Sequence, residues 1–507
     1  MARNLSYWNA TAPARAFPRL AGTVDVDIAV VGGGIVGVTT ARMLKDRGLS
    51  VALVEAHRVG EEVTGKSTAK ITSQHNITYT VIKRKFGADG ARLYAEANET
   101  GLRTIRALAA AHAIDCDLVA ADAFVFTRDE DQIPAIEEEA KLARELGLPA
   151  SLTRETGLPF DVLAAMKWEN QAKFHPVKYV KGLAATVPGG GCHVFEGSRV
   201  VDWDPDRVAT DSGTVRAKHV VMATHLPLGQ IGLFYAEAHP HMDPVIMGRI
   251  APGRAPDGMF INAETPRRSF RTHVDEAGQT WLILAGMNHK PGDTQAGHDN
   301  MAELEAFAAD TFGVTADYRW TNEDYGPIDQ APFVGWSSSI RSAYLVATGF
   351  NAWGITNGTA AAMLIADLAA GRDNPWLKLY DATRIKPIAG AAEFVKGNAE
   401  VAAHLIGGYL KRKLHSFDDL GPDEAAILKV DGHNVAGYRD PEGGLHACSA
   451  VCTHMGCIVG WNGTDRTWDC PCHGSRFALD GGVIHGPAVK PLEPVAVKAE
   501  EEAEEAV

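Results

Sequence analysis

The stretch Asp27-Ile-Ala-Val-Val-Gly-Gly-Gly-Ile-Val-Gly37 decides the fold of the first part of this 507-residue chain. It opens with a continuous apolar run, which is typical of a buried parallel strand. The pattern Gly-x-Gly-x-x-Gly at 32–37 follows and leads into a helical pattern. Residues 50–55, Ser-Val-Ala-Leu-Val-Glu, predict a second strand. The sequence therefore predicts a βαβ unit near the N-terminus.

This unit has the features of a dinucleotide-binding site. Gly32 permits a tight turn, Gly34 lets a pyrophosphate approach the backbone, and Gly37 lets the helix pack closely on the strand. The N-terminus of the helix favours phosphates, and Glu55 at the end of the second strand can accept hydrogen bonds from ribose hydroxyls. The pattern alone does not distinguish FAD from NAD, and a glycine-rich turn without a ligand remains the alternative.

Two Cys-and-His segments mark the other end of the chain, Cys452-Thr-His454-Met-Gly-Cys457 and Cys470-Pro-Cys472-His473-Gly-Ser475. Five of the seven cysteines lie between 448 and 472, which indicates a metal or cluster site rather than the disulfide framework of a secreted protein. Two thiolates and two imidazoles suit a 2Fe–2S cluster with mixed ligands. A tetrahedral zinc site is the alternative.

Composition and charge narrow the function classes. Hydrophobic residues make up 46% and charged residues 22%, as in globular proteins of two or three domains. The net charge is −14, so nucleic acid is not an expected partner. The first residues contain no apolar signal core, and we expect a cytoplasmic protein. The uncharged stretch 342–366 contains many small polar residues, so we expect a buried strand, loop and helix there, and no membrane span.

Periodicity outlines the remaining elements. Helical patterns cover 90–112, 132–146 and 359–370, strand patterns cover 199–203, 220–223, 281–285 and 342–348, and 391–413 predicts a connecting helix. From 427 onward, short strand patterns alternate with turn signals, which predicts a small all-β domain. The segment His239-Pro-His241-Met-Asp243 could ligate mononuclear iron, but its spacing favours a surface loop.

Three further segments favour FAD over NAD through a resemblance. Residues 64–70, 220–225 and 349–358, together with the start of the chain, resemble the FAD-dependent D-amino-acid oxidase/glycine oxidase superfamily over about 25–370. The resemblance implies an α/β FAD-binding domain of the Rossmann-like, glutathione-reductase type with an α+β substrate domain. It places His225 where the family usually has glycine. The Gly-x-Gly-x-x-Gly pattern and the resemblance together predict the residues that contact FAD. These are Gly32, Gly34, Gly37, Glu55, Thr64, Ser67, Thr68, Val200, Ala223, Thr224, Gly349, Asn351, Gly354 and Thr356.

Members of that superfamily remove a hydride from the carbon next to an amine nitrogen, and the flavin carries out this chemistry. The resemblance therefore implies an amine or amino-acid substrate. Arg271 could bind a substrate carboxylate with two hydrogen bonds. His289 and Tyr325 are further candidates for the substrate side. For each of the three, a strand or surface position without a catalytic role is the alternative.

The C-terminal segments resemble a Rieske domain over about 416–498. By the family pattern, Cys452 and Cys470 bind one iron of a 2Fe–2S cluster, and His454 and His473 bind the other. Cys457 and Cys472 would form a disulfide between the two loops, and Gly486-Pro487-Ala488 matches the proline loop that shields the cluster. A zinc site would need neither the additional cysteine pair nor this loop.

The expected organisation is an FAD-dependent oxidoreductase at 25–375, a linker with a connecting helix at 376–415, a Rieske domain at 416–498 and an acidic tail at 499–507. The FAD-binding part would comprise about 25–80, 195–228 and 335–372, and the substrate part about 80–195 and 229–334.

The predicted function is oxidation of a C–N bond by hydride transfer to flavin, with electrons relayed singly through the cluster to a redox partner or oxygen. One alternative is a monooxygenase or reductase fed by a ferredoxin or reductase. The other is a redox sensor in which the cluster is regulatory or structural.

Overall fold

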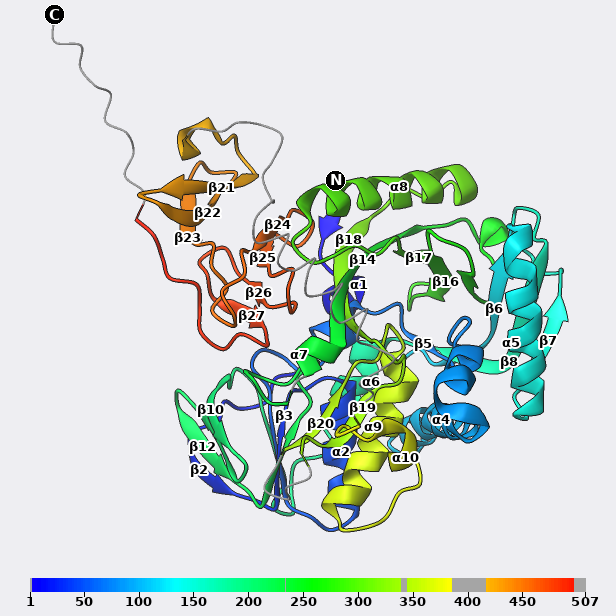
Figure 1. Cartoon of the computed structure of the whole chain (residues 1–507), viewed down its shortest axis with the longest axis horizontal. Coiled ribbons are helices and arrows are strands. Elements are labelled where there is room, and N and C mark those ends of the chain that lie inside the picture. Colours follow the sequence, from blue (N-terminus) through cyan, green and yellow to red (C-terminus); the bar gives the residue numbers. More distant parts are fainter. Residues whose placement is uncertain (1, 233, 339–343, 385–415, 497–507) are drawn as a thin grey trace, which may run out of the picture.

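The computed structural model describes residues 2–232, 234–338, 344–384 and 416–496 (Figure 1). Its first layer is a six-stranded sheet in the order β19-β20-β13-β3-β4-β9, parallel except for the pair β19–β20. The strands are β3 (Ile28–Val31), β4 (Val51–Val54), β9 (His193–Phe195), β13 (His219–Met222), β19 (Phe333–Trp336) and β20 (Leu345–Thr348). The fully buried β3 and β4 confirm the strands predicted from the two apolar runs.

Helices α2 (Ile35–Asp46) and α9 (Gly354–Ala369) contact each other and the strands of this sheet. A smaller sheet, β10-β11-β12-β2, lies on the side of the six-stranded sheet that faces away from these helices (Figure 1). Its strands are β2 (Gly22–Asp25), β10 (Val200–Asp204), β11 (Arg207–Thr210) and β12 (Gly213–Arg216). Together these elements form the expected α/β dinucleotide-binding fold.

A second, ten-stranded sheet runs β1-β18-β14-β17-β16-β15-β6-β8-β5, and β7 pairs with β8. Its strands are β1 (Arg3–Asn4), β5 (Lys70–Ile71), β6 (Val119–Thr127), β7 (Ala150–Thr153), β8 (Ala164–Lys173), β14 (Ala238–Arg249), β15 (Met259–Asn262), β16 (Arg268–Val274), β17 (Thr280–Gly286) and β18 (Tyr318–Pro327). The remaining helices before residue 385 are α1 (Tyr7–Thr11), α3 (Val63–Lys66), α4 (Tyr79–Ala111), α5 (Ile133–Glu145), α6 (Pro176–Ala184), α7 (Phe234–Glu237), α8 (Thr294–Phe312) and α10 (Leu377–Tyr380), with 3₁₀ turns at Glu130–Gln132 and Pro252–Arg254. This α+β part contains the expected substrate domain.

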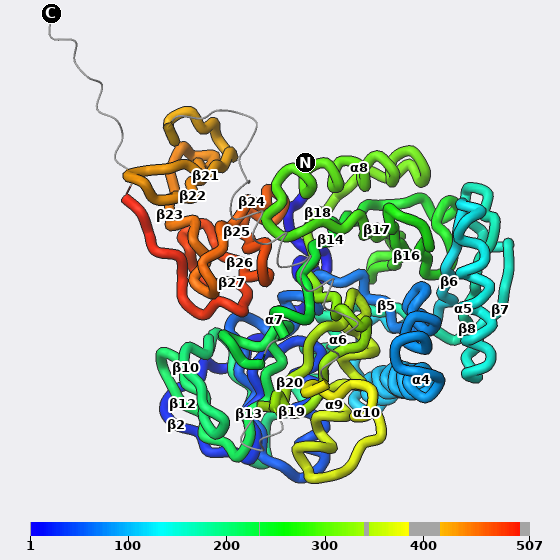
Figure 2. The backbone as a smooth tube through the Cα atoms, in the orientation of Figure 1, coloured from blue at the N-terminus to red at the C-terminus, as the bar shows by residue number. Residues whose placement is uncertain are grey.

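The C-terminal domain consists of two small antiparallel sheets, β21-β22-β23 and β24-β25-β26-β27. A 3₁₀ turn at Phe417–Asp419 precedes β21 (Glu424–Val430), β22 (His433–Arg439), β23 (Leu445–Ser449), β24 (Gly460–Asn462), β25 (Thr467–Asp469), β26 (Arg476–Phe477) and β27 (Val483–His485). Figure 2 shows this orange-to-red domain beside the green strands β14 and β18. The predicted connecting helix at 391–413 and the acidic tail lie outside the described residues.

The structure corrects two sequence expectations, at residues 239–243 and at the start of the helix predicted from residue 90, and it adds an element before residue 25. Residues 239–243 do not form a surface loop, because they belong to β14 and pair with β18. The N-terminal segment before residue 25, which the sequence left without an element, contributes α1 and the fully buried Trp8. Helix α4 also begins eleven residues earlier than predicted, with a backbone break at Gly87, where φ is 75°. Within the described residues, no helix has the length and apolar character needed to cross a bilayer.

Candidate functional site

A first cavity, of about 180 Å³, lies at the carboxyl ends of β3, β4 and β13. This is the edge at which parallel α/β sheets bind nucleotides. Of the predicted FAD-contacting residues, those that line it are Gly32, Gly34, Glu55, Thr64, Ser67, Val200, Ala223, Thr224 and Gly354. Thr68, Asn351 and Thr356 line a second cavity instead. Gly349 lines neither cavity and packs against Pro327.

The glycines do what the pattern requires. Gly32 has φ of 105°, and a Cβ there would lie 2.4 Å from the carbonyl oxygen of Ala223. A Cβ on Gly37 would lie 1.9 Å from the carbonyl oxygen of Gly32, so only glycine lets α2 approach β3 this closely. The Thr64 hydroxyl accepts a hydrogen bond from the Ile35 N–H at 3.0 Å, at the beginning of α2. Backbone at a helix N-terminus therefore faces the cavity, as a bound pyrophosphate needs.

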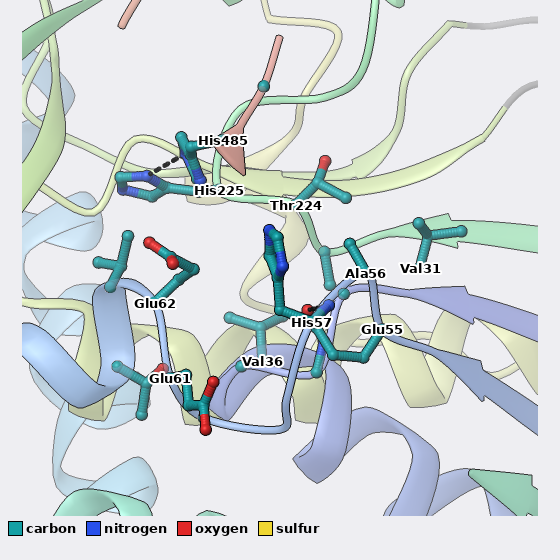
Figure 3. A pocket seen from close by; sticks show the side chains of 18 of the residues that line it. Val31, Val36, Glu55, Ala56, His57, Glu61, Glu62, Thr224, His225 and His485 are labelled. Atoms are coloured by element: carbon teal, nitrogen blue, oxygen red, sulfur yellow. Dashed lines mark hydrogen bonds between the residues drawn. The ribbon is translucent and has the colours of Figure 1, made fainter. Parts of the chain in front are cut away.

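Glu55 closes the turn as well as lining the cavity. Its carboxylate accepts hydrogen bonds from the N–H groups of Gly33 at 2.6 Å and His57 at 2.7 Å. Burial raises the pKa of Glu55, and these two N–H donors oppose the rise. Figure 3 shows Glu55, His57 and Glu62 around the same space.

The second cavity, of about 530 Å³, lies between the ten-stranded sheet and residues 351–356 at the beginning of α9, and it shares Ser67, Asn322, Ala352 and Ile355 with the first. Their common wall makes the pair suitable for a dinucleotide with a substrate beyond it. Three of the β14 residues that line the second cavity have titratable side chains: His239, His241 and Asp243. They are alternate residues of a strand and therefore share one face. In the described residues these three do not converge as metal ligands, and the only converging group of such side chains lies among the C-terminal cysteines.

Arg271, predicted to bind a substrate carboxylate, does not line the cavity. Its fully buried guanidinium donates hydrogen bonds to the carbonyl oxygens of Thr68 at 2.6 Å, Thr272 at 3.1 Å and Phe174 at 3.1 Å. It also lies over the Trp8 ring, 5.1 Å from its centroid. The structure therefore corrects this prediction, because all three guanidinium nitrogens of Arg271 are engaged with the protein's own backbone.

His289 and Tyr325 are likewise absent from the residues that line the second cavity. His289 exchanges backbone hydrogen bonds with Met242, near the segment that meets the C-terminal domain. Tyr325 is fully buried, and its hydroxyl donates a 2.9 Å hydrogen bond to the carbonyl oxygen of His473. The substrate role expected for each is not supported, because each side chain lies toward the C-terminal domain.

Sequence reasoning missed Lys70 and Arg267 as polar residues of the second cavity, and it considered Asp243 only as a possible iron ligand or as part of a surface loop. The Lys70 ammonium donates hydrogen bonds to the Phe260 carbonyl oxygen and the Ser269 hydroxyl, and burial lowers its pKa to about 7. Arg267 is exposed beside the cavity. The signal that could have found Asp243 is the alternation of polar residues from 239 to 243, which fits one face of a strand.

The four predicted cluster ligands come together on two loops of the C-terminal domain. The thiols of Cys452 and Cys470 are buried and hydrogen-bonded to each other, which lowers the pKa of Cys452. The imidazole rings of His454 and His473 are 5.0 Å apart. Each has a buried Nδ1 with no hydrogen-bond partner in the described residues. Two buried sulfurs beside two orphaned ring nitrogens fit a 2Fe–2S cluster with two Cys and two His ligands.

Cys457 and Cys472 form a disulfide that joins the two loops. The hydroxyl of Ser475 accepts a 3.0 Å hydrogen bond from the Ala488 N–H and also hydrogen-bonds to Cys452. The proline loop is thereby attached to the cluster-binding loops. Burial, together with the neighbouring His454 and His239, lowers the pKa of His473 to about 4.

Strand β18 separates the cluster-binding loops from the cavities. Asn322, Asp324 and Gly326 line one or both cavities. The alternate residues meet the C-terminal domain: Thr321 binds Asp465, Glu323 packs against Gly474, and Tyr325 binds His473. Because side chains alternate along a strand, one strand thickness lies between the two sites.

A buried charge network holds this interface. Arg476 contacts Asp465 at 2.7 Å and Asp469 at 3.1 Å within the C-terminal domain. Asp465 in turn accepts hydrogen bonds from the N–H and hydroxyl of Thr321, at 3.0 and 2.8 Å, and lies 3.8 Å from the Lys66 ammonium. Each buried charge thus has a partner of opposite sign, which a buried ion pair requires.

Comparison with known proteins agrees with this geometry. The model of the FAD dependent oxidoreductase family (DAO) matches residues 27–368, and that of the Rieske [2Fe-2S] domain matches 412–496. The Bacillus subtilis (strain 168) protein YhfW, described as a Rieske 2Fe-2S iron–sulfur protein, is 34% identical over 496 residues, with 97% of each chain covered. Gamma-glutamylputrescine oxidoreductase of Escherichia coli (strain K12) is 29% identical over 234 residues, which are 44% of this chain and 55% of that protein.

Among solved structures, glycine oxidase from Geobacillus kaustophilus has a TM-score of 0.60 at 18% identity, covering 72% of this chain and 100% of its own. L-proline dehydrogenase from P. horikoshii has a TM-score of 0.56 at 19% identity, covering 72% of this chain and 98% of its own. These likenesses show the shared fold. The chain belongs to the DAO family of FAD-dependent oxidoreductases, with a C-terminal Rieske domain that binds a 2Fe–2S cluster.

Proposed function

We propose that this protein oxidises the C–N bond of an amine or amino acid and passes the electrons through its Rieske cluster to a redox partner. Bound FAD supplies a two-electron hydride acceptor, and the cluster supplies a one-electron carrier. The observation that carries the proposal is the position of β18. One strand has the two cavities on one face and the cluster-binding loops on the other.

The second cavity supplies groups suited to a substrate that has both an amine and an anionic group. Arg267, exposed beside the cavity, can bind a carboxylate with two hydrogen bonds. Lys70 adds positive charge below its pKa of about 7. Asp243, also on the wall, can attract the ammonium group in its ionised form; burial raises its pKa, and His241 and Arg267 oppose the rise. The opposite charges would orient the substrate between them.

A substrate ammonium must lose a proton before its neighbouring carbon can release a hydride. His241 lines the cavity, and its Nε2 lies 3.8 Å from Asp243 Oδ2. His241 can accept the proton through its other ring nitrogen: the amine N–H bond breaks, the electron pair stays on the amine nitrogen, and the imidazole becomes cationic. Asp243 then stabilises the imidazolium through its opposite charge.

The test is an anaerobic and aerobic screen of amines and amino acids against the purified holoprotein, followed by visible absorbance. A substrate should bleach the flavin and then the cluster without any added reductase. Reduction only after a ferredoxin or reductase is added would contradict the proposal and favour electron flow from cluster to flavin. A Lys490→Ala variant, purified in the same way, is the control. Lys490 is exposed and lies outside both cavities.

A further inference from the structure

A segment of the Rieske domain forms part of the wall of the dinucleotide cavity. Ile484, His485, Gly486, Ala488 and Val489 all line the first cavity, with the glycine-rich turn and Glu55. We call residues 484–489 the proline segment. In Figure 3, His485 lies above the cavity, opposite the labelled residues of the first βαβ unit.

Three polar contacts join the proline segment to the flavin domain. The Gly229 N–H donates to the Pro487 carbonyl oxygen at 3.0 Å. The carbonyl oxygen of Ile484 lies 3.2 Å from His57 Nε2. His485 Nε2 lies 3.3 Å from His225 Nδ1 (Figure 3). His225 and His485 also line the first cavity, and so does His57, which contacts Ile484.

The histidine contact continues to a buried carboxylate. Hydrogen bonding to His225 lowers the pKa of buried Asp324 against the effect of burial, so Asp324 is a carboxylate. His225 Nε2 therefore donates to Asp324, at 3.0 Å. His225 Nδ1 lies 3.3 Å from His485 Nε2, and burial lowers the pKa of His485 to about 3. Asp324, His225 and His485 thus form one continuous chain along the cavity wall.

The same segment is attached to the cluster-binding loops on its other side. The Ala488 N–H donates to the Ser475 hydroxyl at 3.0 Å, and His485 pairs with Arg476 between β26 and β27. Six residues therefore connect the FAD cavity directly to the loop that carries Cys470 and His473. A displacement of the segment on either side must be transmitted to the other.

We propose that the proline segment is part of the FAD-binding site: it covers the dinucleotide, and FAD binding and docking of the Rieske domain stabilise each other. The apolar side chains of Ile484, Ala488 and Val489 exclude water from the bound cofactor, and His485 fixes the position of the segment. Such coupling is reciprocal. Loss of FAD must therefore weaken docking of the Rieske domain, and loss of docking must weaken FAD binding by the same factor. This inference does not depend on which substrate is oxidised.

The first test uses His485→Ala in the full-length chain, with Lys490→Ala as the matched control next to the segment. Each protein is stripped of FAD and titrated with FAD, and binding is followed by flavin fluorescence. We expect His485→Ala to bind FAD at least about tenfold more weakly than the wild type, which corresponds to a loss of about 1.4 kcal/mol of binding free energy. Lys490→Ala should bind FAD within twofold of the wild type. An unchanged electron paramagnetic resonance spectrum of the cluster in His485→Ala shows that the Rieske domain is folded. Wild-type FAD affinity in such a folded variant would overturn the proposal.

The second test needs no variant. Iron release from the wild-type cluster to an iron chelator is timed with FAD present and after FAD removal. Because FAD should hold the proline segment over the cluster-binding loops, we expect release several-fold faster from the FAD-free protein, and restoration on adding FAD. Equal rates in the two states would mean that the segment is only a neighbouring surface, and the coupling would be refuted.

Discussion

The phenolic hydroxyl of Tyr325 donates a 2.9 Å hydrogen bond to the backbone carbonyl oxygen of His473, 148 residues away in the sequence. Tyr325 belongs to a strand of the substrate-domain sheet, and His473 is a proposed ligand of the cluster. The neighbouring Asp324 and Gly326 line the two cavities. This contact therefore joins the cluster-binding loop to the wall of the flavin and substrate sites.

Replacing Tyr325 with Phe tests the contact itself. The change leaves the buried His473 carbonyl oxygen without its donor, which costs about 1–3 kcal/mol. We expect a lower urea midpoint for loss of the cluster absorbance and slower cluster reduction after flavin reduction. Tyr318→Phe, at the other end of β18 against Tyr7 and Trp281, is the control and should affect neither. A Tyr325→Phe protein identical to wild type in both would show that the hydroxyl has no role.

Two arginines separate structural from substrate-binding roles. Arg271→Ala removes the partner of three carbonyl oxygens and should lower the free energy of unfolding by about 3 kcal/mol or more. Arg267→Ala, at an exposed position beside the cavity, should leave stability within about 0.5 kcal/mol but raise KM roughly tenfold. Steady-state kinetics and thermal unfolding measured side by side distinguish them. A stable Arg271→Ala protein with a raised KM would reverse our assignment.

Two neutral buried histidines predict acid lability. Burial lowers the pKa of His175 to about 2 and that of His273 to about 3, whereas both titrate near 6.5 when unfolded. Below that value the unfolded chain binds protons that the folded protein does not bind. Stability is thus complete above about pH 6.5 and falls on acidification, by up to about 1.4 kcal/mol per pH unit for each group.

The measurement is the urea midpoint between pH 7 and pH 5. His175→Asn retains an acceptor for the Lys178 N–H at the beginning of α6 and should flatten the pH dependence. His298→Gln changes a histidine that is 80% exposed and should leave the pH dependence unaltered. Equal pH dependence in the wild type and His175→Asn would exclude His175 as a source of the acid lability.

Cluster ligation predicts a selective loss. Cys452→Ser replaces a proposed thiolate ligand and should abolish the Rieske paramagnetic signal, while at saturating FAD the flavin absorbance is retained because Cys452 lies outside the dinucleotide cavity. Iron analysis and the visible spectrum measure both cofactors in one sample. Undiminished transfer of electrons from substrate to the external acceptor in this variant would indicate that the cluster is regulatory or structural.

The parts of the fold that were predictable are those with strong local patterns. The buried strands β3 and β4 are continuous apolar runs, and Gly32 and Gly37 are required by close backbone contacts. The proposed cluster ligands stand out in the sequence because their spacing is set by short loops. These features depend on neighbours in the sequence, so they can be seen without the tertiary structure.

The substrate side could not be predicted because it depends on strand pairing between distant segments. Pro240 and Pro244 in β14 argued against a strand, since proline cannot donate a ladder hydrogen bond. Both lie in the part of β14 that precedes its pairing with β17, which begins at Val245. Arg271 has the residue type of a carboxylate-binding group, and only its three backbone partners reveal its structural role.

The central claim is that substrate electrons pass from the flavin across β18 to the cluster. Its most direct test is anaerobic stopped-flow mixing of the holoprotein with an amine substrate found in the screen, recording flavin and cluster absorbance together. We predict that the flavin bleaches first, that the cluster bleaches next, and that no added reductase is needed. A cluster that stays oxidised while the flavin is fully reduced would contradict the claim.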